Sequence, residues 1–449
     1  MSGRVKKQRT ATNTADSATL SLNERILKEC HDFYVDPKNG LIKLASELDI
    51  ALLAPRKKIT VLLIGNHSAG KSSFINWYVE EHILKTGVAI ETQGFAFVTS
   101  GKKRETLTGN ATLHLYPHFK PLSEIKGLID YVGTEISTSK QKKFSLVTFI
   151  DTPGLVDGEM NYPFDVEKAI KFLGNLADLI FVFFDPIGQA LRKRTLNVVD
   201  ELTAQHGDKI KLFLSKADEA GNETDRQKVL MQIVQELCKR PGLNRAGFDL
   251  STIFIPNPNK PARCVNQIED VCKEIEKTIN RTVQNTLNTL ESDCTKIENA
   301  VVDILKNNEK SKSENLRSSR KGVLLGLVGF TLPFLLVTSF FISSASRSLL
   351  ESLLGKSTSE VLKLYVRPLE AVWTYLPEDT HTFIIIFIVV ISLFLLILAY
   401  LHIRLKPTLS RKQKNALLET KEYVMRVIKC RKKQLYDDYL RQSVAEHEL

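Results

Sequence analysis

The sequence predicts an α/β domain with a mainly parallel sheet and helices on both faces, followed by a helical stalk and a hairpin of two membrane-spanning helices. Three observations carry this prediction. Short apolar runs alternate with helical patterns over residues 57–260, a long amphipathic pattern follows, and two uninterrupted apolar segments stand further along. With 449 residues the chain is too long for one hydrophobic core, so we expect two or three structural units.

The chain opens with a basic tail, residues 1–20, that we expect to be disordered. Lysine, arginine and hydroxyl residues dominate it and it contains no apolar run, so it is not a secretory signal. Because acidic residues are absent before Asp16, an organelle-targeting role stays open. Residues 21–56 then show a helical pattern that is interrupted near Pro37 to Gly40, and we expect these helices to pack with the stalk.

An α/β pattern fills residues 57–260. Short apolar runs between amphipathic helices are typical of buried strands in a mainly parallel sheet with helices on both faces. The strand candidates are 58–64, 144–150, 178–184, 209–215 and 251–256. Helical patterns separate most of them, at 71–83, 122–132, 163–175, 191–204 and 224–239.

The stalk is predicted at residues 261–320. Apolar residues recur there at steps of three and four from Val265 to Leu305, which indicates one long amphipathic helix or a helix pair with coiled-coil character. Such a helix packs onto the first 55 residues as a bundle, or it acts as a lever that carries motion from the preceding domain. Both interpretations stay open.

Two apolar segments predict a transmembrane hairpin over residues 321–404. Segments 322–346 and 380–403 contain 25 and 24 residues without Asp, Glu, Lys or Arg, and about 20 suffice to cross a bilayer. Basic residues flank the outer ends of both segments, so both termini are expected in the cytosol. The 347–379 connection lies on the far membrane surface or folds as a small helical hairpin.

The C-terminal tail, residues 405–449, is basic and has helical spacing. A solvated helix, contact with an anionic leaflet and folding back on the stalk are all compatible with it. The net charge of +11 allows an anionic lipid surface or nucleic acid as partner, and beside the apolar segments we expect no nucleic acid. The six cysteines form no Cys-x-x-Cys pair, which argues against a zinc site or a disulfide framework.

The sequence Gly-x-x-x-x-Gly-Lys-Ser stands between a predicted strand and a predicted helix, from Gly65 to Ser72. Such a P-loop turns its backbone N–H groups toward the β- and γ-phosphates of a nucleotide, and the helix N-terminus adds its dipole. Lys71 would neutralise phosphate charge, and Ser72 would bind Mg²⁺. The candidate nucleotide-binding residues of this loop are Gly65, Asn66, His67, Ser68, Ala69, Gly70, Lys71, Ser72 and Ser73.

Two further motifs stand at the ends of predicted strands. Asp151 in Phe-Ile-Asp-Thr-Pro-Gly would reach Mg²⁺ through water, and the N–H of Gly154 would sense the γ-phosphate. In Leu-Ser-Lys-Ala-Asp, Lys216 would lie along the base and Asp218 would accept hydrogen bonds from guanine. Three motifs in this order predict a P-loop nucleoside triphosphatase.

The segments Ser-Ala-Gly-Lys-Ser-Ser, Asp-Thr-Pro-Gly and Ser-Lys-Ala-Asp resemble the dynamin superfamily of large GTPases and, within it, the EH-domain ATPases and sarcalumenin-like proteins. The stretches 91–98, 109–117, 162–185 and 206–219 add to this resemblance, which extends over residues 22–300. It implies a nucleotide-driven, self-assembling, membrane-associated protein that uses Mg²⁺ and takes GTP or ATP as substrate.

The chain departs from this family pattern in three respects. It shows no EH domain with calcium loops, and two apolar segments take the place of peripheral lipid insertion, as in mitofusins and atlastins. Ser215 stands where the Asn-Lys-x-Asp motif has asparagine. This leaves GTP and ATP both open as substrate, with Asp218 favouring GTP.

The resemblance also places Thr92 where the family's switch threonine closes over Mg²⁺, with Thr86 and Thr99 as alternatives. Leu155 follows the Asp-Thr-Pro-Gly motif in place of a glutamine, so His67 is a candidate for orienting the attacking water or contacting a second nucleotide domain. The candidate catalytic residues are His67, Ser68, Lys71 and Thr92, and the candidate metal ligands are Ser72, Thr92 and Asp151.

These features together predict a membrane-anchored dynamin-like GTPase that self-associates through its nucleotide domain and stalk, and remodels, tethers or fuses membranes. The alternative is a slow nucleotide-dependent switch or scaffold that recruits partners to a membrane. The expected location is an intracellular organelle, with the endoplasmic reticulum and the mitochondrial outer membrane both open.

Overall fold

The computed structural model divides into two compact units, which are described in turn. One unit contains residues 1–295 and 425–449, and the other contains residues 296–424. The residues that the structure describes are 20–87, 93–155, 162–186, 192–257, 259, 264–344, 356–375 and 377–447. Thr92, one of the predicted site residues, lies outside them.

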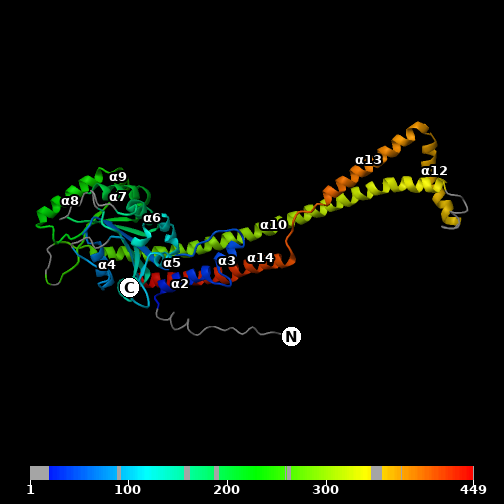
Figure 1. Ribbon diagram of the computed structural model, residues 1–449. Helices are drawn as coiled ribbons and strands as arrows, with labels where there is room; N and C mark the ends of the chain where they lie inside the picture. The colour runs from blue at the N-terminus through cyan, green and yellow to red at the C-terminus, as the bar shows by residue number, and fades with distance from the viewer. Residues whose placement is uncertain are drawn as a thin grey trace, which may run out of the picture. The chain divides into compact units, whose positions relative to one another are not determined.

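The first unit is built on an eight-stranded sheet (Figure 1). Its order is β3-β4-β2-β5-β1-β6-β7-β8. All neighbouring strands are parallel except the pairs β2–β5 and β3–β4, so the predicted mainly parallel α/β sheet is confirmed. The strands are β1 (Ile59–Gly65), β2 (Phe95–Ser100), β3 (Glu105–Thr108), β4 (Val132–Ser137), β5 (Val147–Asp151), β6 (Leu179–Phe184), β7 (Ile210–Leu214) and β8 (Leu250–Thr252).

Helices cover both faces of the sheet because the central strands are apolar on both sides. On one face, residues such as Leu62 and Ile180 join a buried core with the helices α6, α7, α8 and α9. On the other, Phe74 of α4 packs edge-on against Phe149 and Phe181, with ring centroids 6.2 and 6.1 Å apart. The helices are α4 (Lys71–Val79), α5 (Asn110–Leu115), α6 (Val166–Leu176), α7 (Lys193–His206), α8 (Glu223–Cys238) and α9 (Pro241–Ala246).

The helix expected at residues 122–132 is wrong. Two short 3₁₀ segments stand there, Pro117–Glu124 and Ile129–Tyr131. Apolar residues do recur at helical spacing, but Gly127 between the two segments has φ of +78°, a left-handed conformation that an α-helix does not contain. A Cβ at this position would also lie 2.8 Å from the carbonyl oxygen of Pro163.

A helical bundle completes the first unit. It contains α2 (Leu22–Val35), α3 (Leu41–Ser46), the beginning of α10 (Ile268–Ser344) and α15 (Cys430–His447). Tyr34 of α2 donates a buried hydrogen bond of 2.8 Å to Asp293 of α10. Arg431 of α15 forms two hydrogen bonds with Glu29 of α2. Lys432 of α15 pairs with Glu291 of α10 at 2.6 Å, so the end of the C-terminal tail is folded back on the first part of the stalk.

The second unit contains an antiparallel pair formed by the last part of α10 and α13 (Glu378–Ile403) (Figure 1). Small residues bring the two helices together, because a Cβ at Gly322 would lie only 2.9 Å from the side chain of Ile403. The buried hydroxyl of Ser392 donates a 2.5 Å hydrogen bond to the carbonyl of Gly329. The glycines at these positions thus serve the hairpin itself.

Two shorter helices accompany this hairpin in the second unit. Helix α12 (Lys356–Tyr375) lies in the connection between the apolar segments, so part of that connection is helical. Helix α14 (Arg411–Tyr423) follows α13 and forms ion pairs with α10 through Lys414–Glu309 and Lys421–Glu298. A π-helical turn, Val424–Lys429, leads from α14 to α15.

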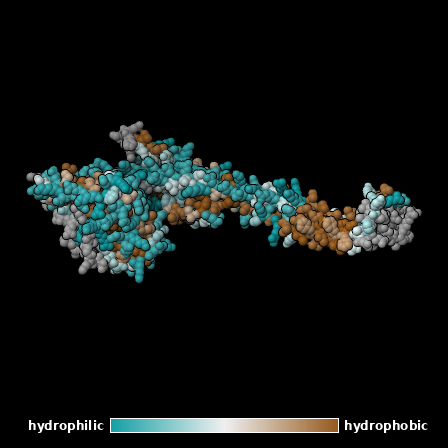
Figure 2. Space-filling model, turned by 90° about the horizontal axis from the view of Figure 1, so that it is seen from above, coloured by the Kyte–Doolittle hydropathy of each residue, from teal (hydrophilic) through white to brown (hydrophobic). Residues whose placement is uncertain are grey.

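Among the described residues, two helices are long and apolar enough to cross a membrane, judged by length and composition. They are part of α10 and residues 382–403 of α13, whose most apolar stretch has a mean hydropathy of 3.3. Large apolar side chains on both are exposed, for example Leu327 and Phe383. Figure 2 shows hydrophobic surface gathered over this hairpin. Contiguous exposed apolar surface of this kind marks a site of contact with a protein partner or with a membrane.

Candidate functional site

The phosphate-binding loop joins β1 to α4 through unusual backbone conformations. Gly70, immediately before α4, has φ of +86°, and Ser68 has φ of +56° although it is not a glycine. Gly65 ends β1 against β6, where a Cβ would lie 2.6 Å from the carbonyl oxygen of Phe183. A curled backbone at a helix N-terminus directs N–H groups outward, the arrangement that binds phosphate.

Lys71 lies across this loop. Its side chain is almost fully buried, and its ammonium donates hydrogen bonds of 3.2 and 2.9 Å to the carbonyl oxygens of Gly65 and Asn66. Burial lowers the pKa of Lys71, whereas the negative charge of Asp151 raises it. Phosphate oxygens are stronger acceptors for an ammonium group than two neutral carbonyls are, so this lysine can hold a triphosphate.

Ser72 and Asp151 face each other at the start of α4 and the end of β5. The Ser72 hydroxyl donates a 2.5 Å hydrogen bond to Oδ2 of Asp151. Oδ1 of Asp151 is buried and has no hydrogen-bond partner among the residues that the structure describes. Burial raises the pKa of Asp151, and Lys71, Ser72 and the Thr152 N–H oppose that rise.

This pair fits Mg²⁺ chemically, because Mg²⁺ prefers oxygen ligands and keeps several of its waters. The free carboxylate oxygen of Asp151 would accept a hydrogen bond from such a water, and the Ser72 hydroxyl would bind the ion directly. When bound, Mg²⁺ would neutralise phosphate charge. Within the described residues no cluster of three or more His, Cys, Asp or Glu side chains could hold a metal, so any ion here would also depend on the nucleotide.

Asp151→Asn is expected to weaken Mg²⁺ affinity in the presence of nucleotide by about 10- to 100-fold, the range observed when an outer-shell partner is removed. The amide keeps the shape of the carboxylate but loses its charge. Titration of nucleotide turnover with Mg²⁺ measures the effect, with Asp165→Asn, at the N-cap of α6, as a carboxylate control. Equal Mg²⁺ requirements in Asp151→Asn and wild type would contradict this assignment.

The Asp-Thr-Pro-Gly segment is docked directly on the phosphate-binding loop. Thr152 donates a 2.7 Å hydrogen bond to the carbonyl of Leu63 in β1. The Leu155 N–H donates to the carbonyl of Gly65 at 3.3 Å. A Cβ at Gly154 would lie 2.5 Å from Cα of His67. Any shift of one loop must therefore move the other, which is the physical requirement for a phosphate-sensing switch.

The candidate catalytic residues and the residues considered as alternatives to them differ in burial and in hydrogen-bond partners. His67 lies in the loop beside Gly154 and is half-buried, whereas Leu155 is fully buried and offers no polar group to orient water. Thr99, one alternative to Thr92, is committed to the sheet, where it accepts a 2.9 Å hydrogen bond from Lys58. Thr86 is exposed.

A recess lies beside the phosphate-binding loop at the end of β7. Its volume is about 180 Å³, and Ser215, Lys216 and Asp218 line it together with Gly70 and Ser73. It thus brings together the loop and the Ser-Lys-Ala-Asp segment that the sequence predicts to contact the nucleotide base. The remaining lining residues are Phe74, Phe183, Glu219, Ile253, Phe254, Ile255 and Ile268.

The Ser-Lys-Ala-Asp segment is held in place from the neighbouring strand. The Ser215 hydroxyl donates a 3.1 Å hydrogen bond to the carbonyl of Phe184, at the end of β6. Lys216 has φ of +49°, and its ammonium pairs with Asp185 at 3.2 Å. Ser215 thus anchors this segment to the end of β6.

Two residues of the site were missed by the sequence interpretation. Thr195 of α7 donates a buried 2.6 Å hydrogen bond to the side chain of Asn66 in the phosphate-binding loop. Asp185 holds Lys216. Asp185 directly follows the apolar run of β6, so its position at a strand end could have identified it. Nothing in the sequence around Thr195 marks it as a site residue, because its partner Asn66 is 129 residues away.

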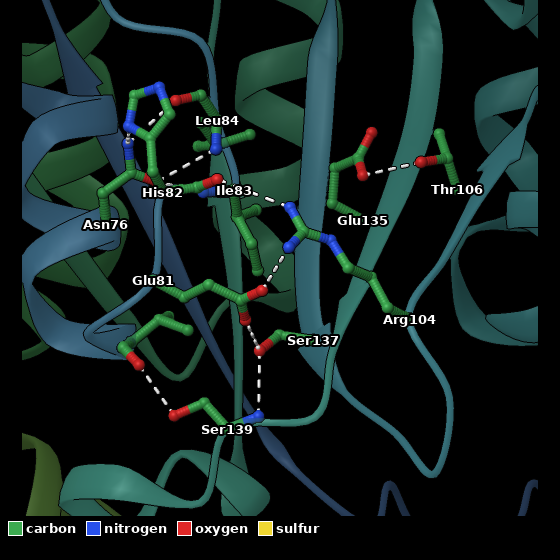
Figure 3. Close-up of polar contacts among 11 residues, drawn as sticks. Asn76, Glu81, His82, Ile83, Leu84, Arg104, Thr106, Glu135, Ser137 and Ser139 are labelled. Carbon is green, nitrogen blue, oxygen red and sulfur yellow. Dashed lines mark hydrogen bonds and ion pairs between the residues drawn. The ribbon is translucent and has the colours of Figure 1, made fainter.

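A polar network fixes the chain as it leaves α4 (Figure 3). The Asn76 side chain accepts hydrogen bonds from the N–H groups of Ile83 and Leu84 at 3.1 and 2.9 Å. Glu81 pairs with Arg104 at 2.5 Å. The segment after the phosphate-binding helix is therefore tied back to that helix and across to the chain between β2 and β3.

Comparison with known proteins bears on the same part of the chain. Residues 61–237 match the model of the dynamin family. EH domain-containing protein 1 of Arabidopsis thaliana is 29% identical over 177 residues, covering 37% of this chain and 31% of that protein. EH domain-containing protein 2 of Rattus norvegicus is 27% identical over 168 residues, covering 36% and 30%. The match thus spans about a third of these relatives' length.

Solved structures also resemble this chain. One, described as an oligomerised bacterial dynamin pair that provides a mechanism for long-range sensing and tethering of membranes, has 14% identity and a TM-score of 0.37, and the match covers 94% of this chain and 74% of that one. Toc33 from Arabidopsis thaliana in complex with Mg²⁺ and GMPPNP has 14% identity and a TM-score of 0.29, over 57% of this chain and 97% of that one. The family match and the loop geometry agree, since residues 61–237 match the dynamin family model and contain the P-loop fold described above.

Proposed function

We propose that this protein is a membrane-anchored dynamin-like GTPase. It couples Mg²⁺-dependent binding and hydrolysis of GTP to self-association, and through it to the remodelling, tethering or fusion of membranes. A dynamin-type domain implies a nucleotide hydrolase. The proposal adds that the substrate is GTP, that the apolar hairpin anchors the protein in a membrane, and that hydrolysis drives a change in that membrane.

One observation carries the proposal. The dynamin-type domain and an apolar hairpin belong to the same chain, and one continuous helix, α10, leads from the end of the first into the second. The hairpin would anchor the protein by two spans, with both termini on the cytosolic side because basic residues flank its outer ends. An organelle membrane, such as the endoplasmic reticulum or the mitochondrial outer membrane, is the proposed location, and anionic lipid would favour the basic flanks.

Catalysis would depend on positioning and charge. Lys71 and the loop N–H groups would hold the β- and γ-phosphates, and Ser72 and Asp151 would hold Mg²⁺. By resemblance to the family, Thr92 would belong to the segment that closes over Mg²⁺, and His67 would orient water or contact a second nucleotide domain. Self-association would complete such a site from another copy, through the nucleotide domain and the stalk.

GTP is favoured over ATP because Asp218 lines the recess beside the loop. A carboxylate accepts hydrogen bonds from the N1–H and 2-amino groups of guanine, and adenine offers no matching pair of donors. Asp218→Asn is expected to lower GTP turnover by at least about 100-fold, since two charge-assisted hydrogen bonds are lost. It is expected to gain turnover of xanthosine triphosphate, whose 2-carbonyl accepts from the new amide.

The nucleotide preference is measured on the full-length protein with GTP, ATP and xanthosine triphosphate. Glu219→Gln, at the neighbouring exposed carboxylate of the same recess, is the control and should keep the wild-type preference. If wild type prefers ATP and Asp218→Asn leaves that preference unchanged, the GTP assignment fails and the ATP-using alternative replaces it.

A second candidate function is a slow nucleotide-dependent switch or scaffold that recruits partners to a membrane. The buried Leu155 favours it, because a polar water-orienting side chain is missing at that position. Turnover of protein reconstituted into liposomes separates the two. Turnover that rises with protein density in the membrane supports the remodelling GTPase, and uniformly minimal turnover with nucleotide-dependent partner binding supports the switch.

A further inference from the structure

Two consecutive lysines adopt an unusual backbone conformation between β4 and β5. Lys142 has φ of +45° and ψ of +36°, and Lys143 has φ of +58° and ψ of +27°. Side chains with a Cβ rarely adopt this left-handed region, and two in succession are rarer. Such a conformation persists where surrounding contacts enforce it, so the contacts of this turn indicate what it serves.

Lys142 binds the C-terminal end of α4, the helix that begins with Lys71. Its ammonium donates to the carbonyl of Trp77 at 3.2 Å and to Glu80 at 2.7 Å. It also lies 4.3 Å from the centre of the Trp77 ring, a cation–π contact. The Lys142 carbonyl in turn accepts a 2.6 Å hydrogen bond from the hydroxyl of Tyr78.

Lys143 points to a different element. It forms an ion pair with Glu276, on the third turn of α10. The two lysines therefore hold the phosphate-binding helix and α10 from adjacent positions, and the left-handed backbone turns their side chains toward these different partners.

Titratable groups on α4, on the lysine turn and on α10 also influence one another's pKa. Burial raises the pKa of Tyr78 on α4, and the charges of Cys272 and Glu276 on α10 raise it further. Burial also raises the pKa of Cys272 to about 11, and the positive charge of Lys142 opposes that rise. The end of α4, the lysine turn and the first turns of α10 thus form one cluster.

The turn is also connected to the other half of the site. Strand β5 begins at Val147, just after the turn, and ends at Asp151. We propose that the Lys142–Lys143 turn positions α4 and β5 relative to α10, and so couples occupation of the nucleotide site to α10. This inference rests on the proposed function, because coupling requires that the site bind nucleotide.

Charge reversal at Lys143 tests the coupling. The full-length protein is reconstituted into phosphatidylcholine vesicles, and amide hydrogen exchange of residues 268–290 is compared with and without Mg²⁺ and a non-hydrolysable GTP analogue. Wild type is expected to change exchange in these residues on binding. Lys143→Glu is expected to lose most of that change, and Lys143→Glu combined with Glu276→Lys is expected to restore it.

The control is Lys140→Glu, which makes the same charge change at an exposed position of the same loop. Both Lys143 and Glu276 are half-exposed, so the ion pair contributes little to stability and the variants should fold. All variants should still bind nucleotide, because none of these residues touches the phosphate-binding loop. Lys140→Glu should keep the wild-type affinity, and the affinity of Lys143→Glu should change only by the factor that the lost coupling accounts for.

The fluorescence of Trp77 gives a second test, which probes the contact between Trp77 and Lys142. The chain has two tryptophans, Trp77 and Trp373, so Trp373→Phe leaves Trp77 as the only fluorophore of its kind. Nucleotide is expected to shift Trp77 emission in this background, and Lys142→Met is expected to abolish the shift while nucleotide still binds.

The outcomes separate the two proposals. Failure of wild type to bind any nucleoside triphosphate refutes the proposed function, and the coupling with it. Binding that leaves α10 exchange unchanged, or a response that survives Lys143→Glu, refutes the coupling alone.

Discussion

Replacement of Lys71 by alanine is expected to lower nucleotide turnover by at least about 100-fold. Charge-assisted hydrogen bonds contribute about 1.5–3 kcal/mol each, and the ammonium would make two of them to phosphate oxygens. Its burial strengthens these interactions, because water competes little for them. Turnover of GTP at saturating Mg²⁺ measures the loss, and Lys126→Ala, at an exposed lysine of the same domain, is the control.

The same substitution is also expected to change the dependence of stability on pH. Burial holds the pKa of Asp151 above 3.8, so the native state keeps this proton more tightly than the unfolded chain does. Stability is then higher at acidic pH and falls as the pH rises through the native pKa. Without Lys71 nothing as close offsets the buried carboxylate, so the loss of Tm relative to wild type should be larger at about pH 8 than at about pH 5.

A loss of turnover with unchanged nucleotide affinity would contradict this role, because a lysine that holds phosphates in the ground state must contribute to binding. An equal Tm deficit at both pH values would show that Asp151 stays protonated in the native state. It would then not be the carboxylate that meets Mg²⁺.

The centre of the sheet could be predicted from sequence because its strands are buried on both sides. β6 therefore appears as a continuous apolar run, and β1 and β5 as predominantly apolar ones. The edge strand β3 and its neighbour β4 could not be recognised, since polar residues and glycine interrupt their few apolar positions. β4 pairs with β2, and β3 pairs with β4. Such pairing between separate segments leaves no mark on either sequence alone.

In the candidate site, likewise, the parts formed by neighbouring residues could be predicted and the contacts between distant residues could not. The phosphate-binding loop is encoded within eight residues, so its position between β1 and α4 follows from spacing. The contacts that hold it in place come from distant residues. Thr195 of α7 donates a hydrogen bond to Asn66, and Lys142, in the turn before β5, donates one to α4. Residues of these types occur throughout the chain, and only the fold selects the ones that matter.

Gly154→Ala is expected to abolish turnover and to lower stability by about 1–3 kcal/mol, the usual cost of overpacking. The added Cβ would lie 2.5 Å from Cα and 2.7 Å from N of His67. Both atoms are backbone, so no side-chain rotation relieves the clash. Either the Asp-Thr-Pro-Gly segment or the phosphate-binding loop must move, and the hydrogen bond from Leu155 to Gly65 would break with that movement.

The matched control is Gly133→Ala in β4, where the nearest atom to an added Cβ is 3.4 Å away, an ordinary contact. Chemical denaturation gives the stability of both variants, and nucleotide binding and turnover are measured on the folded fraction. If Gly154→Ala binds nucleotide normally but does not turn it over, the contact with His67 is needed for the switch rather than for the loop itself. If both binding and turnover stay normal, the two segments move independently, and Gly154 cannot report the γ-phosphate to the rest of the domain.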